Sequence, residues 1–242
     1  AVVPDHRGTP AGIISLTGGQ AGPVGRTADL NGMYEAFFNL GCRPFDLSPD
    51  PRFIFMTPQH SRAVANVRFA LMNRDSFVIV TGEIGIGKTT ILNTVLEELG
   101  PDYVTAKLVH TTLSHIELLQ ALLSEFGMPN YSKKKVMLLD TLRSFFLEQH
   151  RAGKHVVIIV DEAQNLSSNA LEELRLLSCI DTSDQRIVSI VLTGQPSLDD
   201  LLDAPGLIQL RQRARLRQRL DAMVESETRD YIRHRLEIAG GN

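Results

Sequence analysis

The stretch that decides the fold is FVIVTGEIGIGKTTIL, residues 77–92 of a 242-residue chain. It opens with four apolar residues, 77–80, which is the unbroken pattern of a short strand buried on both faces. Residues 82–89 follow at once and match G-x-x-x-x-G-K-[ST] at every position. In this pattern backbone N–H groups surround phosphates, the lysine reaches the outer phosphates and the hydroxyl binds Mg²⁺. The stretch therefore predicts a strand, a phosphate-binding loop and a helix.

The loop supplies most of the predicted nucleotide contacts. We assign Lys88 to the outer phosphates and Thr89 to the metal, and we expect a helix from Thr89 to about Leu99. Its N-terminal partial charge of about +0.5 would point at the same anion. The predicted cradle consists of Gly82, Glu83, Ile84, Gly85, Ile86, Gly87, Lys88, Thr89 and Thr90.

A second buried strand is predicted at residues 155–160, HVVIIV, and it ends in Asp161 and Glu162. In enzymes with this phosphate-binding loop, the acid that closes such a strand holds Mg²⁺, and a second acid can polarise the attacking water. We therefore assign Asp161 to the metal and Glu162 to the general base. The alternative is that the two acids only cap the following helix.

Composition and charge exclude several classes of protein. The chain is 43% hydrophobic and 22% charged, within the range of globular proteins and unlike a disordered tail. A net charge of −3 gives no general attraction to nucleic acid or anionic lipid. No apolar run approaches the roughly 20 residues that span a bilayer, and the first residues do not resemble a secretion signal. Cys42 and Cys179 fit no metal or redox spacing, so we expect reduced, buried thiols.

Residues 1–32 differ from the rest of the chain. They hold seven of the 18 glycines, three of the 11 prolines and no aromatic residue. We expect a mobile extension here, with the functional protein beginning at Met33. The predicted division is an extension at 1–32, a nucleotide-binding core at 33–222 and the start of a helical lid at 223–242.

Strands alternate with helices along the core. Helices are expected at 58–74, 114–126, 133–151 and 168–178, and further strands at 103–109 and 186–192. In the first helix we place Val64, Val67, Leu71 and Met72 on the core side. Such alternation predicts a parallel sheet with helices on both faces, and ligands in such folds bind at the carboxyl ends of the strands.

Polar residues also follow the strand at 186–192. Thr193 or Gln195 is positioned to hold the attacking water or to touch the γ-phosphate, and the alternative is a plain turn containing Gly194. Gln164 and Asn165 present the same choice, since they would either sense phosphate or begin the next helix.

Arginine occupies every second position in LRQRARLRQRL, at Arg211, Arg213, Arg215, Arg217 and Arg219. In a strand these side chains share one face, whereas in a helix they spread around the axis. Three interpretations remain open: a solvated face, a patch that tracks nucleic-acid phosphates, or arginines inserted into the nucleotide site of a neighbouring subunit.

The order of motifs resembles one family. From Met33 onward the chain resembles the AAA+ ATPases of the general secretion pathway A type, including relatives associated with exosortase systems. The resemblance rests on MYEAFFNLGCRPFDLSPDPRFIFMTPQHSRAV, TGEIGIGKTT, VVIIVDEAQNL, LTGQPSLDDLL and ETRDYIRHRLEIAG, and it covers about 210 residues. It implies an α/β P-loop NTPase fold of the AAA+ type, with a five-stranded parallel sheet between helices and only the start of a helical lid.

The resemblance also implies residue roles and ligands. The ligands are ATP and Mg²⁺, bound between subunits of a ring or partial ring. Thr193 or Gln195 would be the sensor and Arg211 or Arg213 the arginine finger. Pro44, Phe53 and Pro58 would help to wall the adenine. Full-length relatives carry a longer lid with a further arginine-type sensor, so we expect nucleotide binding from this chain and leave hydrolysis by it open.

Two functional classes follow. The favoured one is an ATP-driven module that rearranges a protein assembly in envelope secretion or in exopolysaccharide and sorting systems. It would work as a homo-oligomer with envelope proteins, in the cytoplasm or at the inner face of the membrane through partners. The alternative is a DNA-linked helper that resembles the transposition ATPases and binds duplex DNA through residues 211–219. A third reading is a nucleotide-gated module that binds ATP and hardly turns it over.

Overall fold

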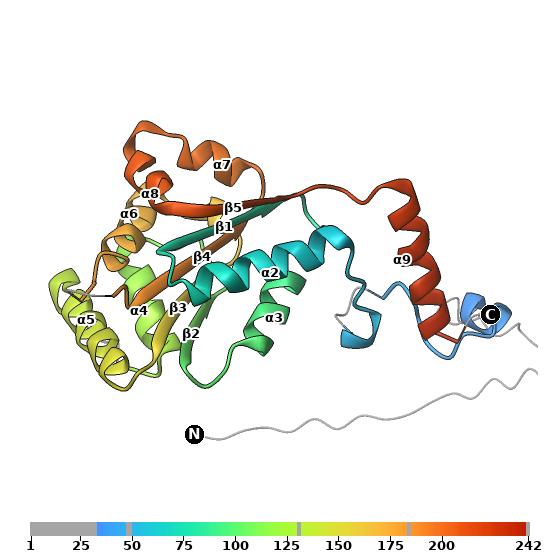
Figure 1. Cartoon of the computed structure of the whole chain (residues 1–242), viewed down its shortest axis with the longest axis horizontal. Helices are drawn as coiled ribbons and strands as arrows, with labels where there is room; N and C mark the ends of the chain where they lie inside the picture. Colours follow the sequence, from blue (N-terminus) through green and yellow to red (C-terminus); the bar gives the residue numbers. More distant parts are fainter. Residues whose placement is uncertain (1–32, 47–49, 130–131, 183–184, 241–242) are drawn as a thin grey trace, which may run out of the picture.

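The computed structural model describes residues 33–46, 50–129, 132–182 and 185–240. The predicted extension at 1–32 lies outside these residues. The described chain forms an α/β body and, beside it, a smaller unit that contains the C-terminal helix (Figure 1). No helix among the described residues is long and apolar enough to cross a membrane.

The body is built on a five-stranded parallel sheet, as predicted. Its strands are β1 (Phe77–Gly82), β2 (Tyr103–Leu108), β3 (His155–Val160), β4 (Val188–Gly194) and β5 (Ala214–Leu220). The order across the sheet is β2-β3-β4-β1-β5, and every neighbouring pair is parallel. All five carboxyl ends therefore meet at one edge of the sheet.

Helices cover both faces of this sheet, because the central strands are apolar on both sides. Phe77 and Ile79 of β1 belong to the hydrophobic cluster on one face, and Val78 and Val80 belong to the cluster on the other. The helices are α2 (Pro58–Met72) and α3 (Lys88–Glu98) on the second face, and α4 (His115–Glu125), α5 (Lys135–Arg151), α6 (Ser168–Leu177), α7 (Ser197–Leu202) and α8 (Ile208–Arg213) on the first. The predicted helices and strands agree with these bounds to within about two residues.

Two expectations about burial were wrong. Met72 is 65% exposed, because α2 already turns Val64, Val67 and Leu71 to the core and the next position lies about 100° further round the helix. Both cysteines are free thiols, but Cys42 is half-buried and Cys179 is exposed. Cys179 follows the end of α6, and its thiol bonds the carbonyl of Arg175 on the surface.

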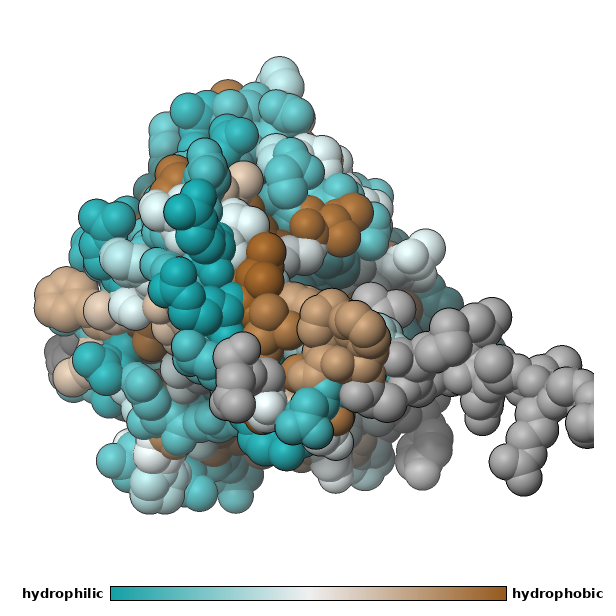
Figure 2. All heavy atoms as spheres, turned by 90° about the vertical axis from the view of Figure 1, so that its right-hand side faces the viewer, coloured by the Kyte–Doolittle hydropathy of each residue, from teal (hydrophilic) through white to brown (hydrophobic). Residues whose placement is uncertain are grey.

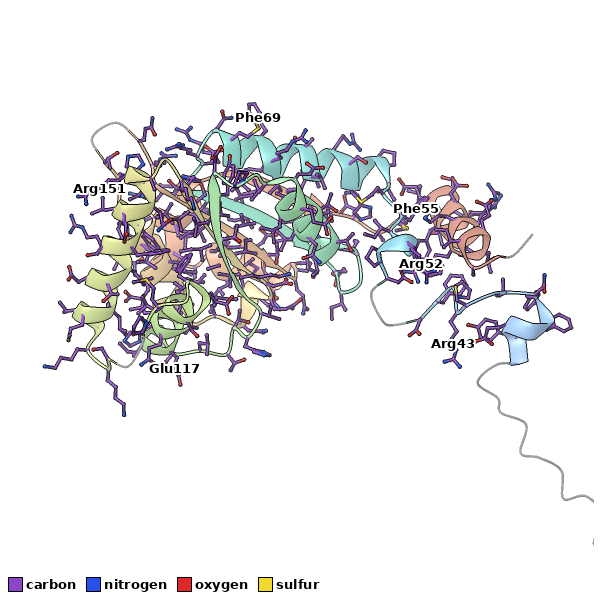
Figure 3. All side chains as sticks on the ribbon, turned by 90° about the horizontal axis from the view of Figure 1, so that it is seen from below. Arg43, Arg52, Phe55, Phe69, Glu117 and Arg151 are labelled. Carbon is purple, nitrogen blue, oxygen red and sulfur yellow. The ribbon has the colours of Figure 1, made fainter. Side chains whose placement is uncertain are left out.

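The smaller unit combines two segments that lie far apart in the sequence. Helix α9 (Glu225–Ile238) packs against η2 (Pro51–Phe53). The short helix α1 (Met33–Phe37) comes before η2 in the chain, and between them the N–H of Gly41 donates to the carbonyl of Ala239 after α9. His234 bonds the carbonyl of Ile54, and the ring of Phe55 meets that of Tyr231 edge-on. Figure 3 shows Arg52 and Phe55 beside α9, away from the sheet. We call residues 41–46 and 50–56 together with α9 the side unit.

A buried histidine makes the stability of the body depend on pH. His155 begins β3, is 3% exposed and bonds the Ser189 hydroxyl through Nε2 at 2.8 Å. Burial, with smaller contributions from the charges of Arg74 and His150, lowers the pKa of His155 from 6.5 to about 4. Between these values the unfolded chain binds more protons than the folded chain. Protonation of His155 therefore leaves the free energy of unfolding unchanged above pH 6.5 and lowers it as the pH drops toward 4.

The expected loss over this window is about 3 kcal/mol of unfolding free energy. Urea unfolding at several pH values, compared between the parent chain and His155→Gln, measures it, because the variant lacks the titrating ring. His110→Gln, which alters an exposed histidine, is the matched control and should behave as the parent chain does. The same pH dependence in His155→Gln and in the parent would contradict this assignment.

Candidate nucleotide-binding and hydrolysis site

The polar residues predicted from separate motifs meet at the carboxyl edge of the sheet. Val80 of β1 pairs with Thr193 of β4, and Val160 of β3 pairs with Leu192. This register sets Thr193 between the loop that follows β1 and Asp161, which follows β3. The two predicted halves of the site are therefore neighbours in space although more than 70 residues separate them.

The glycine-rich loop is closed by Lys88, which is 5% exposed at the start of α3. Its ammonium donates to the carbonyls of Gly82 and Glu83, at 2.8 Å each. Gly87, directly before it, has φ +98°, and a Cβ there would lie 2.9 Å from the ring of His60. A glycine is therefore required at 87 by both backbone conformation and space.

His60 links this loop to the beginning of α2. Its Nδ1 accepts from the backbone N–H of Thr57 at 3.2 Å, so the neutral ring carries its proton on Nε2. Nε2 then donates to the carbonyl of Ile86 in the loop, at 2.8 Å. Since Thr57 directly follows the side unit, one buried histidine joins the side unit, α2 and the loop.

The side chains of the predicted metal ligands lie within hydrogen-bonding distance of one another. The hydroxyl of Thr89 donates to Oδ2 of Asp161 at 3.1 Å, and the hydroxyl of Thr193 donates to Oδ1 at 2.7 Å. Mg²⁺ prefers oxygen ligands and is held in such sites by one or two protein oxygens together with substrate phosphates and water. The pair Thr89 and Asp161 fits that requirement. Within the described residues, no group of three or more His, Cys, Asp or Glu side chains could hold a metal.

Glu162 has an unusual backbone, with φ +52° and ψ +41°. Such a conformation costs a non-glycine residue of order 1–3 kcal/mol and often occurs at functional sites. Neighbouring groups hold it: the hydroxyl of Thr111 donates to its carbonyl at 3.0 Å, and its N–H donates to Asp161 at 3.1 Å. The conformation sends the Glu162 side chain toward β4, where Gln164 and Gln195 donate to Oε2.

A pocket of about 610 Å³ opens between the loop and the side unit. Its walls come from the loop, from α3, from residues 50–56 and from α9. Phe53, expected near the adenine, lines this pocket, and Arg235 of α9 stacks over the Phe53 ring at 5.3 Å and over Tyr231 at 5.1 Å. Pro44 does not line this pocket; it is a buried residue within the side unit, and its carbonyl accepts from Arg235.

Pro58, the other proline expected at the adenine, is the first residue of α2 and also does not line the pocket.

The arginines divide between two elements. Arg211 and Arg213 end α8, at the edge of the sheet opposite to Lys88 and Glu162, because β5 starts at Ala214 and pairs there with Phe77. They therefore cannot reach the site of their own chain. Arg215, Arg217 and Arg219 alternate along β5 and are exposed.

Aspartates neutralise most of this arginine series. Arg211 pairs with Asp203 at 3.0 Å and Arg217 with Asp199 at 2.8 Å. Arg215 pairs more loosely with Asp75 at 3.5 Å, and Arg219 with Asp221 at 3.9 Å. For Arg213 no ion pair or hydrogen bond occurs within the described part of the chain.

Sequence reasoning missed two contributors to the site, His60 and the α9 pair Tyr231 and Arg235. A signal existed for each. Thr57 and His60 have the three-residue spacing of a helix cap, and Tyr231 and Arg235 are four residues apart, which places them on one helix face.

Comparison with known proteins places this site in a family. The sequence model described as "AAA domain" matches residues 71–202, which is more than half of the chain. The chain belongs to the AAA domain family. The matched span runs from the end of α2 to α7 and contains the glycine-rich loop, Asp161, Glu162 and Gln195.

This AAA domain has curated relatives of two kinds. It is 38% identical over 210 residues to General secretion pathway protein A of Aeromonas hydrophila, covering 86% of this chain and 38% of the relative. It is 30% identical over 149 residues to ATP-dependent target DNA activator B of Escherichia phage Mu, covering 62% of this chain and 44% of that protein. The chain thus spans about two fifths of the length of these relatives.

Among solved structures, the ADP form of the Aeropyrum pernix ORC2 protein aligns with a TM-score of 0.59 and 18% sequence identity. The match covers 77% of this chain and 56% of that one. At this identity the likeness shows a shared AAA+ fold.

Proposed function

We propose that this AAA domain binds and hydrolyses ATP with Mg²⁺ and uses turnover to rearrange a protein assembly, in envelope secretion or a related exopolysaccharide or sorting system. The observation that carries the proposal is the meeting of Lys88, Thr89, Asp161 and Glu162 at one edge of the sheet. The relative from Aeromonas hydrophila, with 38% identity, supports the secretion context.

Each residue has a proposed task. Mg²⁺, when bound, would neutralise charge on the β- and γ-phosphates. Lys88 would exchange its loop carbonyls for phosphate oxygens, and Thr89 and Asp161 would hold the metal. Glu162 would accept a proton from water as the water oxygen bonds to the γ-phosphorus and the bond to the bridging oxygen breaks, which leaves ADP and phosphate. Gln195 or Thr193 would sense the γ-phosphate; Thr193 already donates to Asp161 and Gln195 to Glu162.

The proposed pocket for the adenine ring of ATP lies next to the glycine-rich loop. Phe53, Tyr231 and Arg235 offer flat faces for a purine, and the walls from α3 and the side unit complete the enclosure. We further propose that residues 33–222 are the nucleotide-binding core and 223–242 the start of a lid, since β5 ends at Leu220 and α9 begins at Glu225.

A second copy of the chain is the proposed partner at the site. Arg211 and Arg213 lie at the wrong edge of the sheet for their own nucleotide, so a finger at either position would act on the nucleotide of a neighbouring subunit. Apolar side chains also gather on the α9 side of the molecule (Figure 2). Phe37 and Phe38 are 81% and 61% exposed, as is typical of surfaces that meet another protein. Because ATP is the substrate, we place this assembly in the cytoplasm, at the inner face of the membrane through partners.

The relative from phage Mu favours the second candidate, a DNA-linked helper ATPase. The arginine series argues against duplex binding through residues 211–219, because four of its five arginines face aspartates of the same chain. Phosphates would have to displace these partners before counterion release could favour binding.

The test is the ATP hydrolysis rate per subunit against protein concentration, with and without duplex DNA, and with Lys88→Ala protein as the blank for contaminating activity. A rate per subunit that rises with concentration and ignores DNA is the expected result, because the finger comes from a neighbour. Stimulation by DNA that falls steeply with salt would instead favour the DNA-linked helper. No turnover at any concentration would leave a module that only binds nucleotide.

A further inference from the structure

Gln164 lies between the ends of β3 and β4, in the short helix η3 (Ala163–Asn165), and its side chain touches both ends. Its Nε2 donates to Oε2 of Glu162 at 2.6 Å. Its Oε1 accepts from the backbone N–H of Gln195 at 3.1 Å. Because a carboxylate only accepts and a backbone N–H only donates, a single orientation of the amide satisfies both partners.

The end of β4 is shaped to admit this amide. A Cβ at position 194 would lie 2.6 Å from Oε1 of Gln164 and 3.0 Å from the side chain of Leu198. The glycine of the Thr-Gly-Gln sequence therefore leaves room for the close approach of Gln164, and a side chain at this position would displace the Gln164 amide or Leu198. The residue pair Gln164 and Gly194 forms a fitted contact rather than a chance surface bond.

This contact restrains the carboxylate of Glu162. Oε2 receives the short bond from Gln164 and a longer one, 3.4 Å, from Nε2 of Gln195. Oε1 accepts no hydrogen bond from the residues that the structure describes. A carboxylate anchored through one oxygen has a restricted rotation, and its other oxygen remains available to accept a proton.

We infer that Gln164 is a positioning residue: its amide ties Oε2 of Glu162 to the backbone at the end of β4 and so reserves Oε1 for the attacking water. The inference rests on the proposed function, since it gives Glu162 the task of base. It also joins the base to the strand that carries Thr193 and Gln195, so a shift at the end of β4 would move the base. Misplacing a reacting group by about 1 Å can cost about 100-fold in rate.

Two substitutions at Gln164 separate its two hydrogen bonds, the one to Glu162 and the one from the N–H of Gln195. Gln164→Glu keeps an oxygen for the N–H of Gln195 but replaces the donor to Glu162 with a second carboxylate. Gln164→Leu removes both contacts. We expect kcat for ATP hydrolysis to fall about 10- to 100-fold in both, with KM for ATP within about twofold of the parent value, because neither change touches the loop.

Hydrogen exchange of the Gln195 amide, followed by NMR, gives a readout that does not depend on turnover. The amide should exchange faster in Gln164→Leu and at the parent rate in Gln164→Glu. Gly194→Ala, which displaces the side-chain amide of Gln164, should match Gln164→Leu both in kcat and in the exchange rate of the Gln195 amide. The double variant Gln164→Leu with Gly194→Ala should have a kcat no lower than that of either single variant. Gly100→Ala is the matched control, since a Cβ there meets nothing within 4 Å.

The outcomes separate this inference from the proposed function. Parent-like kcat in Gln164→Leu, together with lost turnover in Glu162→Gln, would overturn the positioning role and leave the base intact. Normal turnover in Glu162→Gln would remove the base and the inference with it. If the parent chain does not hydrolyse ATP, the proposed hydrolysis fails. An unchanged exchange rate of the Gln195 amide in Gln164→Leu would then also overturn the inferred link through Gln164 between Glu162 and the end of β4.

Discussion

Glu162→Gln is expected to retain nucleotide binding and to lose ATP turnover by about 100- to 10,000-fold, the range that a general base contributes. The substituted amide has nearly the same shape, so the left-handed backbone held by Thr111 and Asp161 should survive. What changes is the ability to accept a proton. The proposed metal ligands Thr89 and Asp161 are untouched, which is why binding should persist.

Two measurements check this expectation: the steady-state rate of phosphate release and the affinity for a fluorescent ATP analogue. Glu125→Gln makes the same chemical change at an exposed position at the end of α4 and should match the parent chain in both. A parent-like rate in Glu162→Gln would refute the base assignment. Loss of binding in that variant would mean that Glu162 holds the nucleotide or its metal instead.

Lys88→Ala is expected to abolish the thermal stabilisation that Mg-ATP gives the parent chain. Ligand stabilisation follows RT ln(1 + [L]/Kd) and reaches about 2.7 kcal/mol when the ligand is at 100 times Kd. The Lys88 ammonium is buried and already turned toward the loop carbonyls, so phosphate oxygens can replace these carbonyls at little cost. Without the ammonium, the loop keeps its N–H groups but loses the one cationic side chain among residues 82–89 that could contact the outer phosphates.

Melting curves with and without Mg-ATP measure the effect. The nucleotide-free melting temperature of Lys88→Ala must be recorded first, because the substitution also removes two hydrogen bonds from the loop. Lys154→Ala removes an exposed lysine from the opposite edge of the sheet, before β3, and should keep the full shift. A full shift in Lys88→Ala would place the phosphates elsewhere.

Local sequence patterns were sufficient for most of the α/β body. Residues 77–80 and 155–160 are buried on both faces as their unbroken apolar pattern predicts, and the glycine-rich motif predicts the edge of the sheet at which a ligand would bind. The fifth strand could not be read from its residues alone. Alternating arginines in residues 211–219 fit either a strand or a helix, and in fact the helix α8 ends at Arg213 before the strand begins.

The pocket walls were harder to predict because they depend on contacts between distant segments. Residue 235 reaches Pro44 and Phe53 across more than 180 positions, and no periodicity in either segment encodes that pairing. The contacts of Gln164 could not be predicted for a similar reason. Its bonding partners are set by the register of β3 against β4 and by the space that Gly194 leaves free.

The strand β5 has a consequence for the solubility of the protein. Within the described residues it pairs only with β1, so its other side has no strand partner. An exposed strand of this kind is a common starting point for aggregation, and charged side chains are a common protection. An incoming strand would have to accommodate Arg215, Arg217 and Arg219 and the aspartates beside them. The arginine series therefore protects the folded protein against forming intermolecular sheets, whether or not it ever meets a nucleotide.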